Sequence, residues 1–468
     1  MGDGGALGNQ IERYKLKIDK RQGGIQRKLV SGLFWVLLAN LLVKPFWILG
    51  VEAGVQNAIG DKAYGFYYAI FSFSYIFNIL LDLGVTNFNT RNIAQHPQLI
   101  TKHLSGILGI KLCLLALYLT VTFSVGLLTG YGSQEFRLLA LLTLCQFLNS
   151  LILYLRSNFE GLLLFRWDSL FSVLDRVLMI VICSLLLWGP RFSLFTIHFS
   201  LYHFVYAQLA AYGLTALLAL TVIIRKTGLR RIRFDRRFFL VILRKSAPFA
   251  LLVLLMASYN RIDPILLRRM VGDAEAGVYA GAFRLLDALT MVCYLVSVPL
   301  LPVFSRLCRE NSRRQIADTV RLVFWPMMLF AVGSAVACSL FAEPLMQWRY
   351  HEHYATYVPV FRVVIFGLIP IGITYIFGTL LTAGGHLRQL NLFAAASLVL
   401  NVVVNLVLIP RLGAVGSAWA SLTAQSFMAV TQLFLAIRLF HLPGSAFLPL
   451  NPNNIYNTVT LMINKNKE

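Results

Sequence analysis

Ten ionisable residues lie inside stretches of the sequence that are otherwise strongly apolar. The basic ones are Lys44, Lys111, Arg176, Arg261, Arg284 and Arg362, and the acidic ones are Asp82, Asp175, Asp263 and Asp287. Arginine binds phosphate oxygens through two parallel hydrogen bonds, and lysine acts as a point charge. The carboxylates would offset part of the positive charge or carry protons. These residue types therefore indicate a site for an anionic group, such as a phosphate or a diphosphate.

The composition places these charges in a membrane. Of the 468 residues, 58% are hydrophobic and only 13% are charged, whereas a soluble domain has roughly 25% charged residues. A bilayer core is crossed by roughly 20 apolar residues in a helix. Twelve segments meet that requirement: 29–51, 64–88, 104–128, 137–158, 168–189, 198–224, 246–270, 276–302, 321–342, 358–381, 388–410 and 414–440. The predicted fold class is an all-α membrane protein of about twelve transmembrane helices.

The distribution of lysine and arginine predicts how these spans are oriented. With the N-terminus inside, the inner segments hold 29 basic residues and the outer segments hold 7. Cytoplasmic loops carry this kind of excess, so both termini are expected on the cytoplasmic side. The net charge of +22 then reflects topology and contact with anionic lipid headgroups. Nucleic acid is not expected as a partner.

A short motif occurs twice in the sequence, at an offset of 212 residues. The pattern GDxxxGxYxxxF is formed by Gly60, Asp61, Gly65, Tyr67 and Phe71, and again by Gly272, Asp273, Gly277, Tyr279 and Phe283. Each copy is expected in an outer loop, and six spans separate the two copies. They therefore share one orientation, as in the parallel repeats of transporters. Two facing lobes of six helices would enclose a central cavity suited to alternating access.

The repeat also predicts how the chain divides. The expected parts are a basic cytoplasmic N-terminus (1–28), an N-lobe holding spans 1–6 (29–224), a basic cytoplasmic linker (225–245), a C-lobe holding spans 7–12 (246–440) and a cytoplasmic tail (441–468).

The depth of the charges narrows the set of candidate site residues. At 1.5 Å per residue, Lys44, Arg261, Asp263, Arg284 and Asp287 all fall in the outer half of the bilayer. A charge near the bilayer centre costs at least ~3 kcal/mol, so each of these needs a wet cavity or a partner. The residues expected to bind substrate in the cavity are Arg284, Lys44, Arg261 and Arg176. Those expected to balance charge or couple transport are Asp287, Asp263 and Asp175.

A purely structural interpretation of the same charges stays open. Arg284 and Asp287 are three residues apart and share one helix face, and Arg261 with Asp263 forms a second candidate pair. Such pairs would only hold helices together. Lys111 is expected to reach the inner headgroups by snorkelling.

No pattern typical of an enzyme is present in the sequence. GxSxG, HExxH, a P-loop and a dinucleotide fingerprint are all missing, so neither catalysis nor a cofactor or metal site is expected. The six cysteines are scattered without metal-ligand or redox spacing, which favours a packing role. Asn401 and Asn405 are four residues apart and are expected to hydrogen-bond a neighbouring helix.

Two segments carry a family resemblance. They are GVYAGAFR from Gly277 to Arg284, and the stretch from GHLR at 385–388 to NVVVNLVLIPRLGAVGSAWA at 401–420. With them, the chain resembles the Wzx-like polysaccharide flippases of the multidrug/oligosaccharidyl-lipid/polysaccharide (MOP) exporter superfamily, along roughly residues 28–440. Arg284 matches a cationic position in the eighth helix of related lipid flippases. The chain differs from fourteen-helix members in lacking two terminal spans.

The resemblance implies a flippase for polyprenyl-diphosphate-linked oligosaccharides, which works by alternating access in a bacterial cytoplasmic (inner) membrane during surface polysaccharide biosynthesis. The implied partners are the lipid-linked oligosaccharide and membrane lipids, with polysaccharide polymerase or glycosyltransferase machinery alongside. Flippases of this kind are similar in using cavity cations to hold the diphosphate.

Two other functions remain open. A multidrug or organic-cation antiporter of the same superfamily would have an acidic, aromatic cavity, whereas a flippase would have a cavity of net positive charge. Basic residues outnumber acidic ones within the predicted spans, which favours the flippase. A non-transporting scaffold for envelope assembly would tolerate neutral substitutions at Arg284 and Lys44.

Overall fold

The computed structural model describes residues 40, 42–43, 45–95, 100–162, 164–189, 199–227, 236–350 and 353–447. Within this part of the chain every regular element is a helix, and no strand occurs. Ten helical stretches of these residues are long and apolar enough to cross a membrane. The predicted all-α membrane architecture is therefore confirmed.

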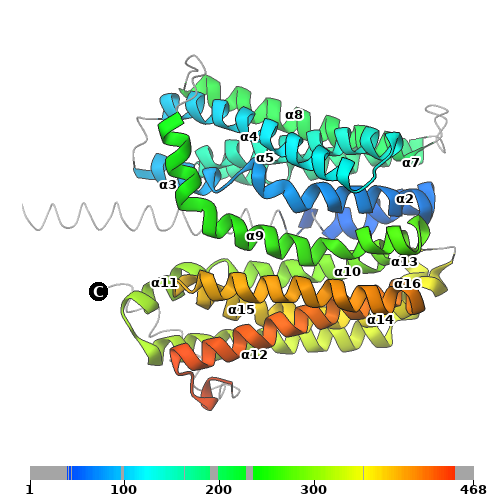
Figure 1. Ribbon diagram of the computed structural model, residues 1–468. Helices are drawn as coiled ribbons and strands as arrows, with labels where there is room; N and C mark the ends of the chain where they lie inside the picture. The colour runs from blue at the N-terminus through cyan, green and yellow to red at the C-terminus, as the bar shows by residue number, and fades with distance from the viewer. Residues whose placement is uncertain are drawn as a thin grey trace, which may run out of the picture.

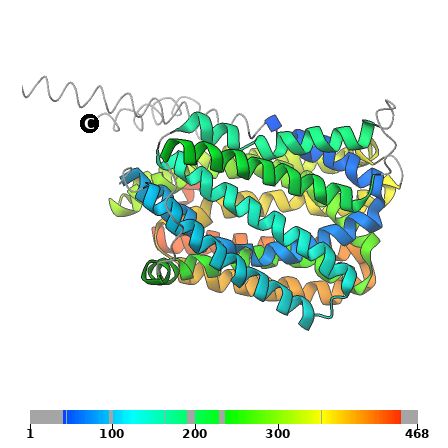
Figure 2. The ribbon, with the colours of Figure 1, turned by 90° about the horizontal axis from the view of Figure 1, so that it is seen from above.

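The helices form two bundles that lie side by side (Figure 1). The N-terminal bundle consists of η1 (Trp47–Val51), α2 (Glu52–Ile76), η2 (Phe77–Leu81), α3 (Val85–Gln95), α4 (Ile100–Leu128), α5 (Ser133–Gly161), α6 (Phe165–Phe171), α7 (Leu174–Trp188) and α8 (Leu201–Thr227). The C-terminal bundle consists of α9 (Arg236–Met270), α10 (Asp273–Ser297), α11 (Leu300–Arg309), α12 (Arg313–Leu340), α13 (Ala342–Arg349), α14 (Tyr354–Val364), η5 (Ile365–Gly367), α15 (Leu368–Ala383), α16 (Leu387–Phe440) and η6 (Gly444–Phe447). Helix α9 runs along the boundary and packs on both α16 and α2. Seen from above, the long helices run in roughly the same direction (Figure 2).

Three glycines interrupt the long helices at one end of the two bundles. Gly60 (φ 80°) breaks α2, Gly272 (φ 126°) precedes α10, and Gly413 (φ 56°) breaks α16. Glycine adopts such positive φ angles without steric cost. At the break in α16, the backbone N–H of Ala414 donates to Oε2 of Glu275, at 2.8 Å. We call this end of the molecule the glycine end.

Several helices begin or end at other residues than the predicted membrane spans. The first span was predicted to end at residue 51, with Gly60 in an outer loop, but helix continues up to Gly60 and resumes directly after it. Helix α16 has 54 residues, about twice the length that a bilayer requires, so it contains both of the last two predicted spans. The predicted first span, 29–51, lies mostly outside the described residues. Helices α8 and α9 extend into the predicted linker, to Thr227 and from Arg236.

The two copies of the repeated motif pack against each other at the glycine end. A Cβ atom built on Gly65 would stand 2.5 Å from the backbone nitrogen of Gly277, and one built on Gly277 would stand 3.0 Å from Cα of Asp61. The absence of a side chain at both positions lets α2 and α10 approach this closely. The equivalent glycine of each copy therefore packs against the backbone of the other copy, as residues do across a two-fold axis. The contact holds the two bundles together at this end.

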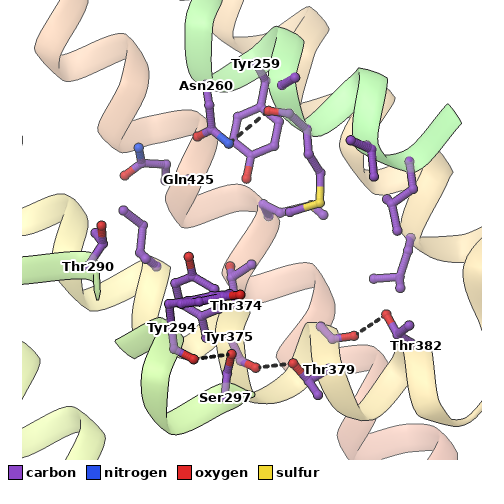
Figure 3. Close-up of a pocket in the computed structure, with 18 of the residues that line it drawn as sticks. Tyr259, Asn260, Thr290, Tyr294, Ser297, Thr374, Tyr375, Thr379, Thr382 and Gln425 are labelled. Carbon is purple, nitrogen blue, oxygen red and sulfur yellow. Dashed lines mark hydrogen bonds between the residues drawn. The ribbon is translucent and has the colours of Figure 1, made fainter. Parts of the chain in front are cut away.

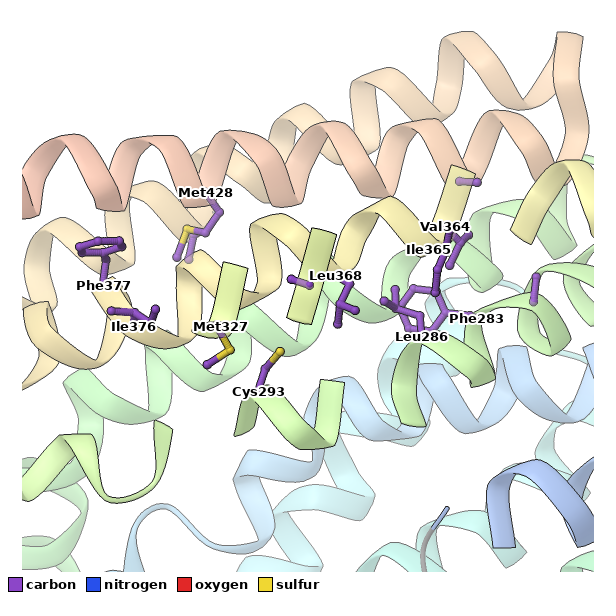
Figure 4. Packing of buried hydrophobic residues seen from close by; sticks show 14 of the residues in the cluster. Phe283, Leu286, Cys293, Met327, Val364, Ile365, Leu368, Ile376, Phe377 and Met428 are labelled. Carbon is purple, nitrogen blue, oxygen red and sulfur yellow. The ribbon is translucent and has the colours of Figure 1, made fainter. Parts of the chain in front are cut away.

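Apolar side chains fill the core of the C-terminal bundle. Figure 4 shows Cys293 of α10 beside Met327 of α12, with Phe377 of α15 and Met428 of α16 in the same cluster. All four are almost completely buried. The six cysteines are free thiols, and the position of Cys293 is consistent with a packing role.

Lys111 is buried and paired, so the prediction that it snorkels is wrong. Its Nζ lies 2.8 Å from Oδ1 of Asp82 and donates to the carbonyl oxygen of Leu81 at 2.9 Å. This carbonyl lies at the end of η2, where the chain breaks around Leu83 (φ 43°). A backbone acceptor inside a membrane requires an internal donor. The ammonium of Lys111 provides such a donor, together with the Ser150 hydroxyl at 3.1 Å, so Lys111 and Asp82 support the fold.

Candidate functional site

A cavity of about 1010 Å³ lies among α9, α10, α15 and α16. Among the residues that the structure describes, its lining comes mostly from the C-terminal bundle, and Tyr75 of α2 and Glu160 of α5 are the ones that the N-terminal bundle adds. Figure 3 shows hydroxyl and amide side chains around this space, from Asn260 to Gln425. The volume is at the upper end of the range for small-molecule sites. It is large enough for a ligand that combines an anionic group with a sugar.

Arg261 of α9 lies at the cavity and contacts the N-terminal bundle. Its Nη1 donates a hydrogen bond of 2.7 Å to the hydroxyl of Tyr68 on α2. The guanidinium carbon lies 5.8 Å from the ring centre of Tyr68 and 5.2 Å from that of Tyr75. In the described part of the chain, no carboxylate lies within 4.0 Å of the guanidinium nitrogens. Asp287 attracts this guanidinium from beyond ion-pair distance, but a cation whose direct contacts are aromatic rings and a hydroxyl retains its capacity to bind an anion.

Arg284 of α10 is held by carboxylates instead. Its Nη2 lies 2.7 Å from Oε1 of Glu52, and its Nη1 lies 3.4 Å from Oδ2 of Asp287. Its Nε donates to the hydroxyl of Tyr64 at 3.3 Å. The predicted contact between Arg284 and Asp287 is therefore present. Asp287 belongs to the cavity lining, whereas Arg284 lies behind it and joins the two bundles.

Glu52 was not identified from the sequence. It is 4% exposed and also accepts a hydrogen bond of 2.9 Å from the Tyr64 hydroxyl. The sequence prediction ended the first span at residue 51 and so left Glu52 in a loop. The helix in fact continues to Gly60. A search for acids up to the next glycine would have included it.

The cluster around Arg284 has no net formal charge. Arg261 and Arg284 supply two positive charges, and Glu52 and Asp287 supply two negative ones. In the described part of the lining itself, the charged residues are Arg261, Asp287 and Glu160. The net positive lining expected for a flippase is therefore not found there. The positive charge available to a ligand is that of Arg261.

Asp263 lies apart from this cluster, because it points into the C-terminal bundle and is fully buried. Its Oδ1 accepts hydrogen bonds from Nδ2 of Asn401 at 2.9 Å and of Asn405 at 2.8 Å, and its Oδ2 accepts one from the Tyr279 hydroxyl at 2.9 Å. The candidate pair of Arg261 with Asp263 is therefore not formed. The two asparagines bond a neighbouring helix, as expected.

The two remaining predicted site residues that the structure describes, Arg176 and Asp175, lie elsewhere. Arg176 and Asp175 form a pair on α7, with 3.5 Å between Nε and Oδ2, and Arg176 lies 5.8 Å from the ring centre of Tyr212. Neither residue belongs to the cavity lining described above. Lys44 lies outside the described residues.

A hydrogen-bond network closes the glycine end between the two bundles. Nε2 of Gln56 donates to the carbonyl oxygen of Gly277 and to the Tyr357 hydroxyl, both at 3.0 Å. Nη2 of Arg349 donates to the carbonyl oxygen of Ile48 at 3.0 Å, and Nδ2 of Asn57 donates to the Arg349 carbonyl at 2.9 Å. Asp61 accepts from the Tyr357 hydroxyl. We call this network the interbundle lock, formed by Gln56, Asn57, Asp61, Gly277, Arg349 and Tyr357.

Two relatives align with this chain. An uncharacterized membrane protein of Methanocaldococcus jannaschii is 22% identical over 447 residues, which cover 88% of this chain and 85% of that protein. The probable low-salt glycan biosynthesis flippase Agl15 of Haloferax volcanii is 26% identical over 178 residues, which cover 37% of each protein.

Two solved structures have a similar fold. An inward-facing multidrug resistance transporter of the MATE family, in the MOP superfamily, matches with a TM-score of 0.67 and 15% identity, over 86% of this chain and 98% of that one. The lipid II flippase MurJ in an inward closed conformation matches with a TM-score of 0.66 and 14% identity, over 86% of this chain and 89% of that one. This likeness confirms the predicted transporter fold.

The family itself is shown by a profile of sequences described as polysaccharide biosynthesis proteins, which matches residues 29–308, more than half of the chain. The resemblance noted in the sequence is thereby confirmed. This chain belongs to the polysaccharide biosynthesis protein family and has the fold of a MOP superfamily transporter.

Proposed function

We propose that this protein is a flippase that moves a polyprenyl-diphosphate-linked oligosaccharide across the membrane by alternating access, for surface polysaccharide biosynthesis. The observation that carries the proposal is Arg261, a cation at the cavity without a carboxylate partner among the described residues. It binds the diphosphate by charge-assisted hydrogen bonds. Arg284 acts behind it, as part of the ion pair that joins the bundles. Lys44, on the first span, is proposed as an additional cation for the same group.

The family and one relative support this kind of substrate. The family is one of polysaccharide biosynthesis, and the partial relative from Haloferax volcanii is named as a probable glycan biosynthesis flippase. A glycan built on one face of a membrane and used on the other requires a transporter for a bulky, polar headgroup. The cavity of about 1010 Å³, whose lining includes hydroxyl and amide groups among apolar side chains, fits that requirement.

The closed glycine end supports alternating access. The interbundle lock and the contact of Gly65 with Gly277 join the bundles there. By the distribution of basic residues, this end faces outward and the other end faces the cytoplasm. The described conformation is then the one that loads substrate from the cytoplasmic side. We propose a cytoplasmic (inner) membrane location, with the polymerase or glycosyltransferase machinery acting on either side of this step. Asp287 and Asp175 are proposed to balance the cationic groups beside them.

A second function has one observation in its favour. Asp287 and Glu160 both belong to the cavity lining, as an organic-cation antiporter would require. However, Asp287 is already paired with Arg284 at 3.4 Å, which reduces the negative charge offered to a cation. The flippase is therefore the function that the site supports better.

The two functions are separated by transport in proteoliposomes. The protein is reconstituted with a fluorescent polyprenyl-diphosphate-linked oligosaccharide, and movement between leaflets is followed by quenching from outside. We expect movement with the native protein, loss with Arg261→Gln, and no change with the exposed control Arg309→Gln. Uptake of ethidium instead of movement of the lipid would favour the antiporter. If neither is transported, a scaffold role is supported.

A further inference from the structure

Arg349 of α13 is a buried cation at the glycine end, and one of its nitrogens has no partner. The residue is 4% exposed. Its Nε donates to the Tyr350 hydroxyl at 2.9 Å, and its Nη2 donates to the Ile48 carbonyl oxygen at 3.0 Å. Nη1 is also buried, and nothing in the described part of the chain accepts a hydrogen bond from it. A buried donor of a charged group without an acceptor is unfavourable.

The direct partners of the Arg349 guanidinium are neutral. A hydroxyl and a carbonyl oxygen accept its hydrogen bonds, and the ring centre of Tyr350 lies 5.4 Å from its Cζ. Asp61 is the carboxylate of the interbundle lock, but its Oδ1 accepts from Gln56 at 3.0 Å and from the Tyr357 hydroxyl. Among the described residues, no carboxylate oxygen lies within 4.0 Å of the Arg349 nitrogens.

The partners of Arg349 belong to different bundles. Tyr350 follows Arg349 in the C-terminal bundle, whereas Ile48 and Asp61 lie on η1 and α2 of the N-terminal bundle. Separation of the bundles at the glycine end therefore breaks the bond from Nη2 to Ile48 and keeps the bond from Nε to Tyr350. Nη1 and Nη2 are then both free, and Asp61 moves away with α2. Two neighbouring N–H donors of a guanidinium bind phosphate oxygens through parallel hydrogen bonds.

The position of Arg349 fits a phosphate carried by a lipid. Its backbone carbonyl accepts from Asn57, three residues before Gly60, so the end of α13 lies at the glycine end (Figure 1). The preceding residue, Trp348, is 65% exposed, and tryptophan is enriched at the level of the lipid headgroups. By the distribution of basic residues this end faces outward. A phosphate at the outer headgroup level would thus reach Arg349 once the bundles separate.

We propose that Arg349 forms a second anion site, which exists only while the bundles are apart at the glycine end and which binds the phosphate oxygens of a lipid in the outer leaflet. The inference rests on the proposed function, because it requires alternating access. The anion takes the place of the Ile48 carbonyl oxygen. A ligand that binds one of two states shifts the population toward that state, so this anion holds the outer end open. Two lipids carry the required group: the departing diphosphate-linked substrate and a phospholipid.

The test measures the distance between the bundles in a chain that lacks the proposed inner site, through Arg261→Gln. Spin labels at Lys62→Cys on α2 and Ala274→Cys on α10 report this distance by electron paramagnetic resonance, after the six native cysteines are replaced. The nanodiscs consist of digalactosyldiacylglycerol, an uncharged lipid without phosphate. Either farnesyl diphosphate is added, or phosphatidylglycerol is included in the disc. We expect the long-distance population to rise about threefold.

The two additions identify the source of the phosphate. A rise with farnesyl diphosphate alone identifies the departing substrate as the occupant. A rise with phosphatidylglycerol, alone or as well, identifies a phospholipid headgroup. Arg349→Gln should abolish the rise, and Arg349→Lys should keep most of it because the charge remains. The matched control is Arg411→Gln, an exposed arginine two residues before Gly413 at the same end, which should leave the rise unchanged.

A second measurement covers the case in which Arg349→Gln already opens the outer end by weakening the interbundle lock. The affinity for farnesyl diphosphate is measured by isothermal titration calorimetry in a chain that carries Arg261→Gln and Gly65→Val. The valine side chain would collide with the backbone of α10, so the bundles are apart from the start. Adding Arg349→Gln should weaken binding about tenfold.

Three results would overturn the Arg349 site alone, provided that the native chain binds farnesyl diphosphate. They are a rise of equal size in Arg349→Gln, an unchanged affinity when Arg349→Gln is added to the opened chain, and no rise with either lipid. If the native chain does not bind farnesyl diphosphate either, the proposed function is overturned as well.

Discussion

Gly65 and Gly277 lie in direct backbone contact at the glycine end, although 212 residues separate them in the chain. A Cβ atom on Gly65 would stand 2.5 Å from the backbone nitrogen of Gly277, a distance that van der Waals repulsion forbids. The two residues hold the same place in the two copies of the repeated motif. The repeat therefore does more than record the similarity of the two halves, because its copies form the contact that closes one end of the molecule.

A side chain at Gly65 is expected to separate the bundles at this end. Gly65→Val should lengthen the distance between spin labels placed by Lys62→Cys and Ala274→Cys, two exposed positions at the third place of each copy of the motif. Electron paramagnetic resonance measures that distance. Gly333→Val is the control, since a Cβ atom on Gly333 meets nothing within 4 Å. An unchanged distance distribution in Gly65→Val would show that the contact does not determine closure.

The side-chain hydrogen bonds of the interbundle lock are also expected to stabilise the state in which the bundles are in contact at the glycine end. Gln56→Leu removes its hydrogen bonds to Gly277 and Tyr357, each of which contributes about 0.5–1.5 kcal/mol. The closed population should fall, and the same pair of labels should report a broader and longer distance distribution. If the distance distribution of Gln56→Leu were identical to that of the native protein, this prediction would be contradicted.

Glu52 and Arg284 are expected to be energetically coupled. Removing one member of a buried pair costs about 3 kcal/mol or more, because the other charge is left without a partner. Glu52→Gln and Arg284→Gln should each lower the free energy of unfolding in mixed micelles. The double variant should lose less than the sum of the two, by about 1 kcal/mol or more. Strict additivity would mean that the pair, at 2.7 Å, contributes nothing.

Asp263 is expected to stabilise the C-terminal bundle. In Asp263→Asn, one oxygen acceptor becomes a donor that faces the amides of Asn401 and Asn405, so about 1–3 kcal/mol of stability is lost. The affinity for farnesyl diphosphate should stay within twofold of the native value, since Asp263 does not line the cavity. Transport that loses its pH dependence at unchanged stability would instead support the coupling role predicted from the sequence.

Much of the fold could be predicted from the sequence, because hydrophobic length and basic residues report directly on the bilayer. The repeat around Gly65 and Gly277 was recognised from residue spacing alone. The helix boundaries were less accurate. An apolar stretch ends where hydropathy falls, whereas the helix ends at Gly60, where φ turns positive. For this reason the sequence prediction omitted Glu52.

The site was predicted only in part, because depth along a helix does not determine the direction of a side chain. Arg261 and Asp263 are two residues apart, yet one lies at the cavity and the other is buried among asparagines. Gln425 and Gln432 carry no charge, so nothing in their residue type distinguished a cavity wall from a helix contact. These assignments required the packing of α9, α10 and α16.

The central claim is that Arg261, rather than Arg284, binds the anionic group of the substrate. The most direct test is the affinity of the nanodisc-embedded protein for farnesyl diphosphate, compared among the native chain, Arg261→Gln and Arg309→Gln. Loss of hydrogen bonds to a charged group costs about 1.5–3 kcal/mol, so Arg261→Gln should bind roughly 10- to 100-fold more weakly, with Arg309→Gln unchanged. Native affinity in Arg261→Gln would contradict the account.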